Sequence, residues 1–177
     1  MTPHIRPAQP HEWDQILGVI AAAFNQAKVG KFAEAIRASD RWIEQLSLVA
    51  ECDGRIVGHV CLSRGTLQTA SSSLDVLCLA PLAVHPAMQR QGIGRALIAH
   101  ALARAAERTE PFVVLEGDPS LYSRLGFHRA ADYGIERPST LIPEPAFQLA
   151  LLPHYCTELR GQIVYPQFFY ELECVGP

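Results

Sequence analysis

The sequence lacks an excess of positive charge. Its 177 residues include 15 Lys and Arg against 18 Asp and Glu, a formal net charge of −3 with His neutral. Domains built to bind nucleic acid carry a basic face that displaces counterions from phosphates. We therefore expect no nucleic-acid partner. The hydrophobic content is that of a folded globular chain.

Long hydrophobic runs and metal-binding spacings are also missing. The longest strongly apolar run, Val76–Val84, is far shorter than the ~20 residues of a membrane-spanning helix. Residues 1–7 lack the apolar centre of a secretion signal, so we expect a cytoplasmic protein with no membrane partner. The five Cys show no CxxC spacing and the seven His no HExxH spacing. These patterns predict reduced core thiols and no metal site.

No repeat or low-complexity segment divides the chain, which predicts one domain over residues 1–177, with 153–177 as a C-terminal extension packed on it. Strands and helices are mixed along it. Helices are expected over residues 10–24, 31–45, 89–107 and 119–125. Strands are expected near Ile5 and over residues 48–52, 55–62, 74–84, 112–115, 127–131 and 147–152.

Several short signals sharpen this pattern. Asp53-Gly54 lies between two apolar runs and predicts a type I′ hairpin turn. Pro81 has no N–H to donate, so the long apolar strand is expected to bulge or to lose a partner there. Asp118 before Pro119 predicts a helix N-cap, and Gly126 predicts the end of that short helix.

The segment after the long strand contains Gly92 and Gly94 at the first turn of a helix. Free N–H groups and the positive end of the helix dipole favour an anion at such a turn, most naturally a phosphate or pyrophosphate. The alternative is that both glycines only allow the helix to pack closely. A Rossmann fingerprint would need a third glycine near the first strand, and a Walker loop would need Gly-Lys-Ser/Thr, so both are excluded.

Two motifs together resemble the GNAT superfamily of N-acetyltransferases. Gln89-Arg90-Gln91-Gly92-Ile93-Gly94 is similar to its Gln/Arg-x-x-Gly-x-Gly/Ala pattern, and Leu82-Ala83-Val84-His85-Pro86 precedes it. Leu121-Tyr122-Ser123-Arg124-Leu125-Gly126-Phe127 resembles its Tyr-x-x-Gly-Phe segment. The residues of the second motif are most similar to those of the YhbS-like subfamily. The resemblance implies an α/β fold, the GNAT fold, in which a single mixed central β-sheet is splayed at a bulge and flanked by helices.

The resemblance also implies acetyl-CoA as co-substrate and assigns roles to matching positions. The backbone N–H of Leu82 would face the thioester carbonyl, and Tyr122 would be the general acid that protonates the leaving thiolate. The alternative for Tyr122 is a packing role. The implied cofactor-binding residues are Leu82, Ala83, Val84, Gln89, Arg90, Gln91, Gly92, Ile93, Gly94, Arg95 and Ser123.

The sequence departs from the family at two places. It lacks the Asn that commonly precedes the Tyr motif, and Cys78 stands where histone-modifying members carry a glutamate base. Glu116, Glu51 and Asp75 lie on or beside predicted strands, so any of them could accept the proton of an amine through water. The alternative for each is an ordinary surface carboxylate.

The leading hypothesis is therefore acetyl transfer from acetyl-CoA to a primary amine by direct attack, without an acyl-enzyme. A catalytically weak acyl-CoA-binding sensor or scaffold is the competing hypothesis. The acceptor stays open between a small-molecule amine, a peptide N-terminus and a lysine side chain, and the oligomeric state between a monomer and a homodimer.

Overall fold

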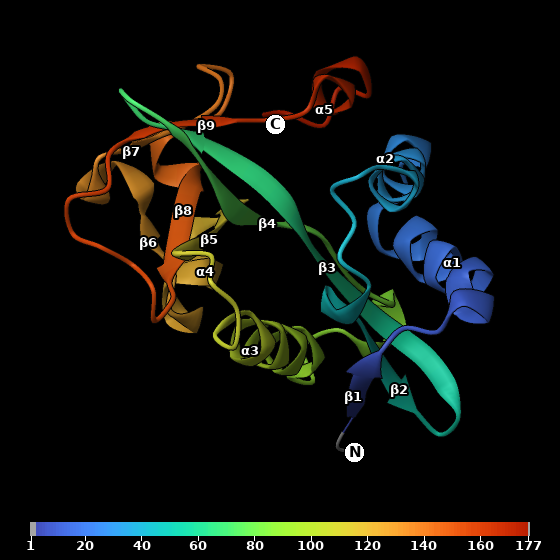
Figure 1. Cartoon of the computed structure of the whole chain (residues 1–177). Helices are drawn as coiled ribbons and strands as arrows, with labels where there is room; N and C mark the ends of the chain where they lie inside the picture. Colours follow the sequence, from blue (N-terminus) through green and yellow to red (C-terminus); the bar gives the residue numbers. More distant parts are fainter. Residues whose placement is uncertain (1–2, 177) are drawn as a thin grey trace. The chain divides into compact units, whose positions relative to one another are not determined.

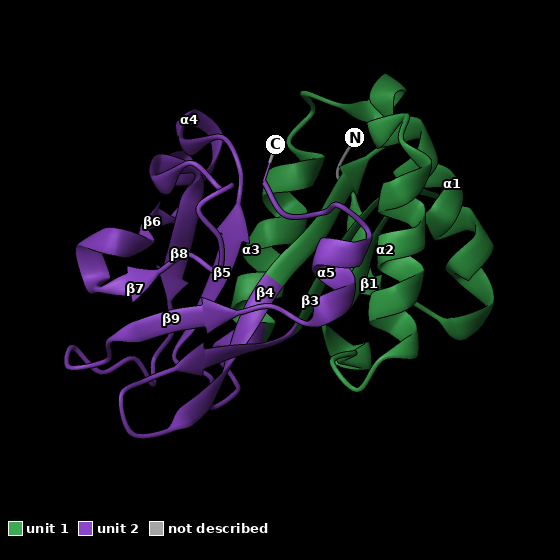
Figure 2. Cartoon of the chain, turned by 90° about the horizontal axis from the view of Figure 1, so that it is seen from above, with its two compact units in different colours: residues 1–63, 79–104 green, residues 64–78, 105–177 purple. Residues whose placement is uncertain are grey.

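The structure is a computed structural model that describes residues 3–176. The described residues divide into two compact units, coloured separately in Figure 2. Unit 1 comprises residues 3–63 and 79–104, and unit 2 comprises residues 64–78 and 105–176. Strands β3 (Arg55–Gln68) and β4 (Ser73–Val84) each contribute to both units.

Unit 1 contains an antiparallel meander. Strand β1 (His4–Pro7) pairs with β2 (Ser47–Cys52), which pairs with β3 across the hairpin. The hairpin turn has positive φ at both central residues, 49° at Asp53 and 72° at Gly54, so the predicted turn is confirmed. Unit 1 also contains the helices α1 (Trp13–Phe24), α2 (Ala27–Ala38) and α3 (Ile93–Ala105). The last residue of α3, Ala105, belongs to unit 2.

The helices of unit 1 cover both faces of its strands. Neighbouring residues along a strand point to opposite faces, so the contacts of two neighbours show which helix lies on each face. Val49 packs in a buried cluster with Ile16 and Ile20 of α1. Its neighbour Ala50 points the other way. A Cβ on Gly58, which pairs with Ala50, would lie 2.9 Å from Leu97 of α3. Figure 2 shows this arrangement, with α1 and α2 on one side of the green strands and α3 on the other.

Unit 2 contains a mixed set of strands, labelled in Figure 1. Strand β4 runs parallel to β5 (Phe112–Glu116), and β8 (Phe147–Leu151) pairs antiparallel with β5 and with β6 (His128–Arg129). Strand β9 (Gly161–Val164) pairs antiparallel with the end of β3 and parallel with β7 (Ile135–Glu136). Two short helices, α4 (Pro119–Tyr122) and α5 (Gln167–Glu171), complete the unit. The predicted mixed sheet with flanking helices is confirmed.

Several element boundaries were predicted wrongly; β3, for example, continues past its expected end at residue 62 to Gln68. The helix expected over 31–45 is α2, which ends at Ala38 because Ser39 is extended and its hydroxyl bonds to the Ile36 carbonyl at 2.7 Å. The helix expected from residue 89 begins at Ile93, after a turn. The strand expected over 127–131 has only two residues, since a 3₁₀ turn begins at Ala130. Strand β9 was not predicted.

Candidate active-site residues

In unit 1, the predicted anion-binding turn connects β4 to α3. A 3₁₀ turn at Pro86–Met88 follows the strand, and the backbone then takes positive φ at Arg90 (59°) and at Gly92 (84°). A Cβ on Gly92 would meet no atom within 4 Å, and one on Gly94 would make only an ordinary contact with Val84. Close packing therefore does not explain the glycine at position 92, whereas its backbone conformation does.

The same turn ends at the start of α3, where Gly92 and Arg95 are exposed. The first intrahelical bond there runs from the Ala96 N–H to the Gly92 carbonyl at 3.0 Å. The N–H groups of Ile93, Gly94 and Arg95 come earlier in the helix, where no intrahelical acceptor exists. These donors, the helix dipole and the exposed Arg95 side chain favour an anion. The geometry thus fits a pyrophosphate.

Side chains within the segment hold the turn in shape. Gln89 donates through Nε2 to the Val84 carbonyl at 3.0 Å, and Gln91 donates to the Ala87 carbonyl at 3.3 Å. Among the strand residues before the turn, Ala83 is buried in the cluster beneath α1, and Leu82 and Val84 are half-buried. Two of the predicted cofactor-binding residues, Gln89 and Gln91, are therefore also structural residues of the turn.

In unit 2, Tyr122 ends the short helix α4. The helix is capped as predicted, because the Asp118 carboxylate accepts the Ser120 N–H at 2.8 Å. The Tyr122 ring packs edge-on against Phe127 with centroids 5.7 Å apart. Burial raises the pKa of Tyr122, which keeps its hydroxyl protonated and able to act as an acid. Ser123, next along the chain, is exposed.

The Tyr122 ring also lies directly over the backbone of Gly117. A Cβ at that position would be 2.7 Å from Tyr122 Cδ2 and closer still to Cε2. A side chain on residue 117 would therefore displace the ring. Gly117 is fixed in turn, since its N–H bonds to the Ala146 carbonyl at 3.0 Å and its carbonyl accepts the Gln148 amide at 3.1 Å.

The residue before Gly117 is Glu116, the last residue of β5. Its half-buried carboxylate accepts the backbone N–H of Gly176 at 3.0 Å and interacts with the hydroxyl of Tyr165. Burial raises the pKa of Glu116, and both donors act in the opposite direction. The candidate acid Tyr122 therefore packs against the residue that follows the candidate base Glu116 in the chain.

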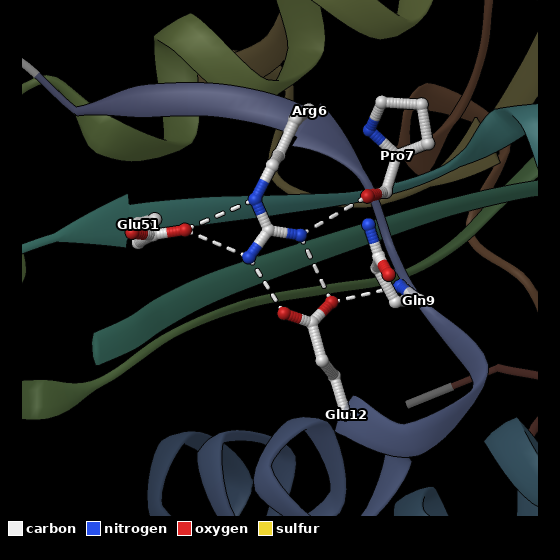
Figure 3. Close-up of polar contacts among 5 residues, drawn as sticks. All are labelled: Arg6, Pro7, Gln9, Glu12 and Glu51. Atoms are coloured by element: carbon white, nitrogen blue, oxygen red, sulfur yellow. Dashed lines mark hydrogen bonds and ion pairs between the residues drawn. The ribbon is translucent and has the colours of Figure 1, made fainter. Parts of the chain in front are cut away.

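The other two candidate bases have different surroundings. Glu51 shares the guanidinium of Arg6 with Glu12, as Figure 3 shows. Arg6 Nη2 lies 2.7 Å from Glu51 and 2.6 Å from Glu12. The network ties β1 to β2 and to the turn before α1. Asp75 is an exposed residue of β4. Of the three carboxylates, only Glu116 combines burial with neutral donors in the part of the chain that the structure describes.

Sequence reasoning missed Tyr165 and Gly176, because they are contributed by a segment with no recognised motif. The Tyr165-Pro166 pair and the aromatic residues after it were the only signals. Among residues 3–176, no group of three or more His, Cys, Asp or Glu could hold a metal ion. No helix within that range is long and apolar enough to cross a membrane. The Cys are free thiols, of which Cys52, Cys61 and Cys78 are buried and Cys156 is exposed.

Known proteins were compared with the chain at both the sequence and the structure level. Residues 4–130 match the acetyltransferase (GNAT) domain family. The chain is 38% identical to the uncharacterized N-acetyltransferase YhbS of Escherichia coli K12 over 128 residues, which covers 70% of this chain and 74% of that protein. It is 32% identical over 123 residues to the uncharacterized N-acetyltransferase YjhQ of the same strain, covering 69% and 67%.

Solved structures give the same result. A crystal structure of E. coli YhbS in complex with CoA matches with a TM-score of 0.87 at 28% identity, over 96% of this chain and 93% of that one. A GNAT acetyltransferase of Brucella melitensis in complex with acetyl-CoA matches with a TM-score of 0.75 at 29% identity, over 94% and 97%. The chain therefore has the GNAT fold and belongs to the GNAT family of acetyltransferases.

Proposed function

We propose that the protein transfers the acetyl group of acetyl-CoA to a primary amine by direct attack. The β4–α3 turn is the observation that carries this proposal, because it presents free N–H groups, a positive-φ glycine and open space where a pyrophosphate would bind. Relatives crystallised with CoA and with acetyl-CoA support it. Leu82 to Val84, Gln89 to Arg95 and Ser123 are the proposed binding residues.

The chain's own residues would supply binding, polarisation and proton transfer. Bound acetyl-CoA would contribute the thioester that makes the acetyl carbon electrophilic. The backbone N–H of Leu82 is proposed to donate to the thioester carbonyl; a preorganised donor of this kind is worth about 3 to 4 kcal/mol in other enzymes.

Proton transfer is proposed for Glu116 and Tyr122 of unit 2. Glu116 accepts a proton from the acceptor ammonium, through water, so that the amine can attack. As the C–N bond forms and the C–S bond breaks, Tyr122 gives its proton to the leaving thiolate. The proton that the newly acetylated nitrogen loses returns to Tyr122 through water. The raised pKa of Glu116 suits its role, because a more basic carboxylate accepts a proton more readily. Tyr122 stays protonated, so its proton is available for the thiolate.

The proposal includes a single domain over residues 1–177 in the cytoplasm. The family match supports one domain, because residues 4–130 include parts of both units. A small-molecule or peptide amine is the proposed acceptor. Light scattering distinguishes a monomer of 19.5 kDa from the proposed alternative, a homodimer of about twice that mass.

Two measurements test the function. Acetyl-CoA at 100 times its Kd should raise the free energy of unfolding by about 2.7 kcal/mol, seen as a higher melting temperature, and no shift at millimolar acetyl-CoA refutes the binding assignment. Release of free thiol across a panel of amines then separates an enzyme from an acyl-CoA sensor, which would bind without turnover.

Tyr122→Phe tests the general acid. It keeps the ring contacts with Gly117 and Phe127 and removes only the hydroxyl, so we expect unchanged acetyl-CoA affinity and a kcat about 100-fold to 10,000-fold lower. The loss should shrink with an acetyl thioester of a more acidic thiol, which leaves as a stable anion. Tyr155→Phe is the matched control, since that ring packs against Tyr133 instead. Parental kcat for Tyr122→Phe on both donors would make Tyr122 a packing residue.

A further inference from the structure

The segment from Tyr165 to Gly176 ends against the carboxylate of Glu116. The Gly176 N–H donates to Glu116 Oε2 at 3.0 Å, a contact between residues 60 positions apart in the chain. The hydroxyl of Tyr165 interacts with the same carboxylate. Both donors are neutral, so neither is a cation that would neutralise the carboxylate.

Packing within unit 2 fixes this segment in place. Strand β9 is hydrogen-bonded to β3 on one side and β7 on the other, and Tyr165 follows it directly. The Tyr165 ring is 7% exposed and stacks on Phe169 of α5, with centroids 4.6 Å apart. The hydroxyl of Tyr170 donates to the Pro138 carbonyl at 3.2 Å, and Val175 is buried.

The last residue of this segment must be glycine. Gly176 has a φ of 81°, and a Cβ there would lie 2.9 Å from the backbone oxygen of Leu141. A side chain at this position is therefore excluded both by conformation and by contact. The close fit against Leu141 is what aims the N–H at Glu116.

We propose that the segment 165–176 belongs to the acid–base apparatus, in which the Gly176 N–H and the Tyr165 hydroxyl position the carboxylate of Glu116. The inference rests on the proposed role of Glu116 as base. Positioning matters because a base must hold its lone pair toward the water or amine that loses the proton. Two neutral donors fix the carboxylate and leave it basic, whereas a bound cation would weaken it as a base.

The titratable groups around Glu116 allow a test by pH. Tyr165, directly after β9, and Tyr170 of α5 face it, and Cys78 of β4 faces Tyr165. Burial raises the pKa of both tyrosines, so they stay protonated while Glu116 titrates. Each donor favours the charged carboxylate. Removing one should therefore raise the pKa of Glu116 further, by about one unit for one hydrogen bond to a charged group.

The experiment measures that pKa directly. The Glu116 carboxyl is titrated by NMR in full-length protein labelled with ¹³C at glutamate side chains, and its signal is assigned by its loss in Glu116→Gln. In Tyr165→Phe and in Gly176→Ala, we expect the Glu116 pKa to rise by about one unit. The acid limb of the kcat/KM profile should shift by the same amount while KM for acetyl-CoA stays at the parental value.

Two control variants separate positioning from general loosening. Tyr170→Phe removes a hydroxyl from the same segment that bonds to Pro138. Gly54→Ala changes another positive-φ glycine, at which an added Cβ would meet no atom within 4 Å. Both should leave the titration of Glu116 unchanged. A parental titration in Tyr165→Phe and in Gly176→Ala overturns the inference, and so does an equal shift in the controls.

The outcome for Glu116→Gln distinguishes this inference from the proposed function. If that variant is inactive while the two donor variants titrate like the parent, Glu116 is the base and the segment does not position it. If it keeps the parental rate and pH profile while the donor variants shift the titration, the contacts hold the carboxylate but Glu116 is not the base.

Discussion

Replacing Gly117 with alanine should move the candidate general acid without touching its chemistry. The added Cβ would lie 2.7 Å from Tyr122 Cδ2, and ordinary contact begins at 3.4 Å, so the ring must shift by at least 0.7 Å. Displacements of about 1 Å at a reacting group can cost about 100-fold in rate. We therefore expect kcat to fall about 10-fold to 100-fold, with the affinity for acetyl-CoA unchanged because the β4–α3 turn is not altered.

The assay is free-thiol release at saturating acetyl-CoA. Gly18→Ala is the matched control, because a Cβ on that exposed residue of α1 would meet no atom within 4 Å. The effect should also be non-additive: in a Tyr122→Phe background, the same alanine should cost little more, since the hydroxyl that it displaces is already gone. A parental kcat for Gly117→Ala, or full additivity with Tyr122→Phe, would refute the reasoning.

Three further perturbations follow from the same structure. Gly92→Glu should abolish acetyl-CoA binding in isothermal titration, whereas Gly92→Ala, which shares the strain of a 84° φ without the charge, should weaken it less. Arg6→Met should lower the free energy of unfolding at neutral pH by about 2 to 4 kcal/mol in urea, because Glu12 is left buried and unpaired. The Arg6 guanidinium holds the pKa of Glu12 below its ordinary value, so this stabilisation is present above that value and is lost as pH falls; an equal penalty at acidic pH would contradict it. His59 is fully buried and its pKa is lowered to about 3, so stability should fall by about 1.4 kcal/mol per unit below about pH 6 as the unfolded chain takes up the proton, and His59→Gln should remove that slope.

The sequence predicted those features whose signals are local. The Asp53-Gly54 turn, the Asp118 cap and the end of the short helix at Gly126 each depend on residues next to one another, and the structure has all three. The glycine turn before α3 was predicted for the same reason, because the need for glycine there comes from the local backbone conformation.

Features that depend on distant residues could not be predicted in this way. Helical periodicity alone predicted that the helix continues past Trp42. Helix α2 ends earlier, and Ile43 reaches the core from a loop, a placement that depends on tertiary packing. Strand β9 pairs with segments 96 and 26 residues earlier, at Leu67 with Ile163 and at Ile135 with Gly161, and no local pattern encodes that register. The surroundings of Glu116 are missed for the same reason, since Gly176 lies 60 positions away.

Glu51 and Glu116 show why residue type alone could not choose between the candidate bases. Both are strand carboxylates with hydrogen-bond donors, yet Arg6 is a permanent cation that loses one of its two carboxylate partners if Glu51 takes a proton. The donors to Glu116 are an amide and a phenol, which lose little when the carboxylate is neutralised. Proton uptake at Glu51 therefore breaks an ion pair shared with Glu12, whereas proton uptake at Glu116 relieves the cost of a buried charge. The second carboxylate is the one that can accept a proton in each turnover without disturbing the packing of β1 on β2.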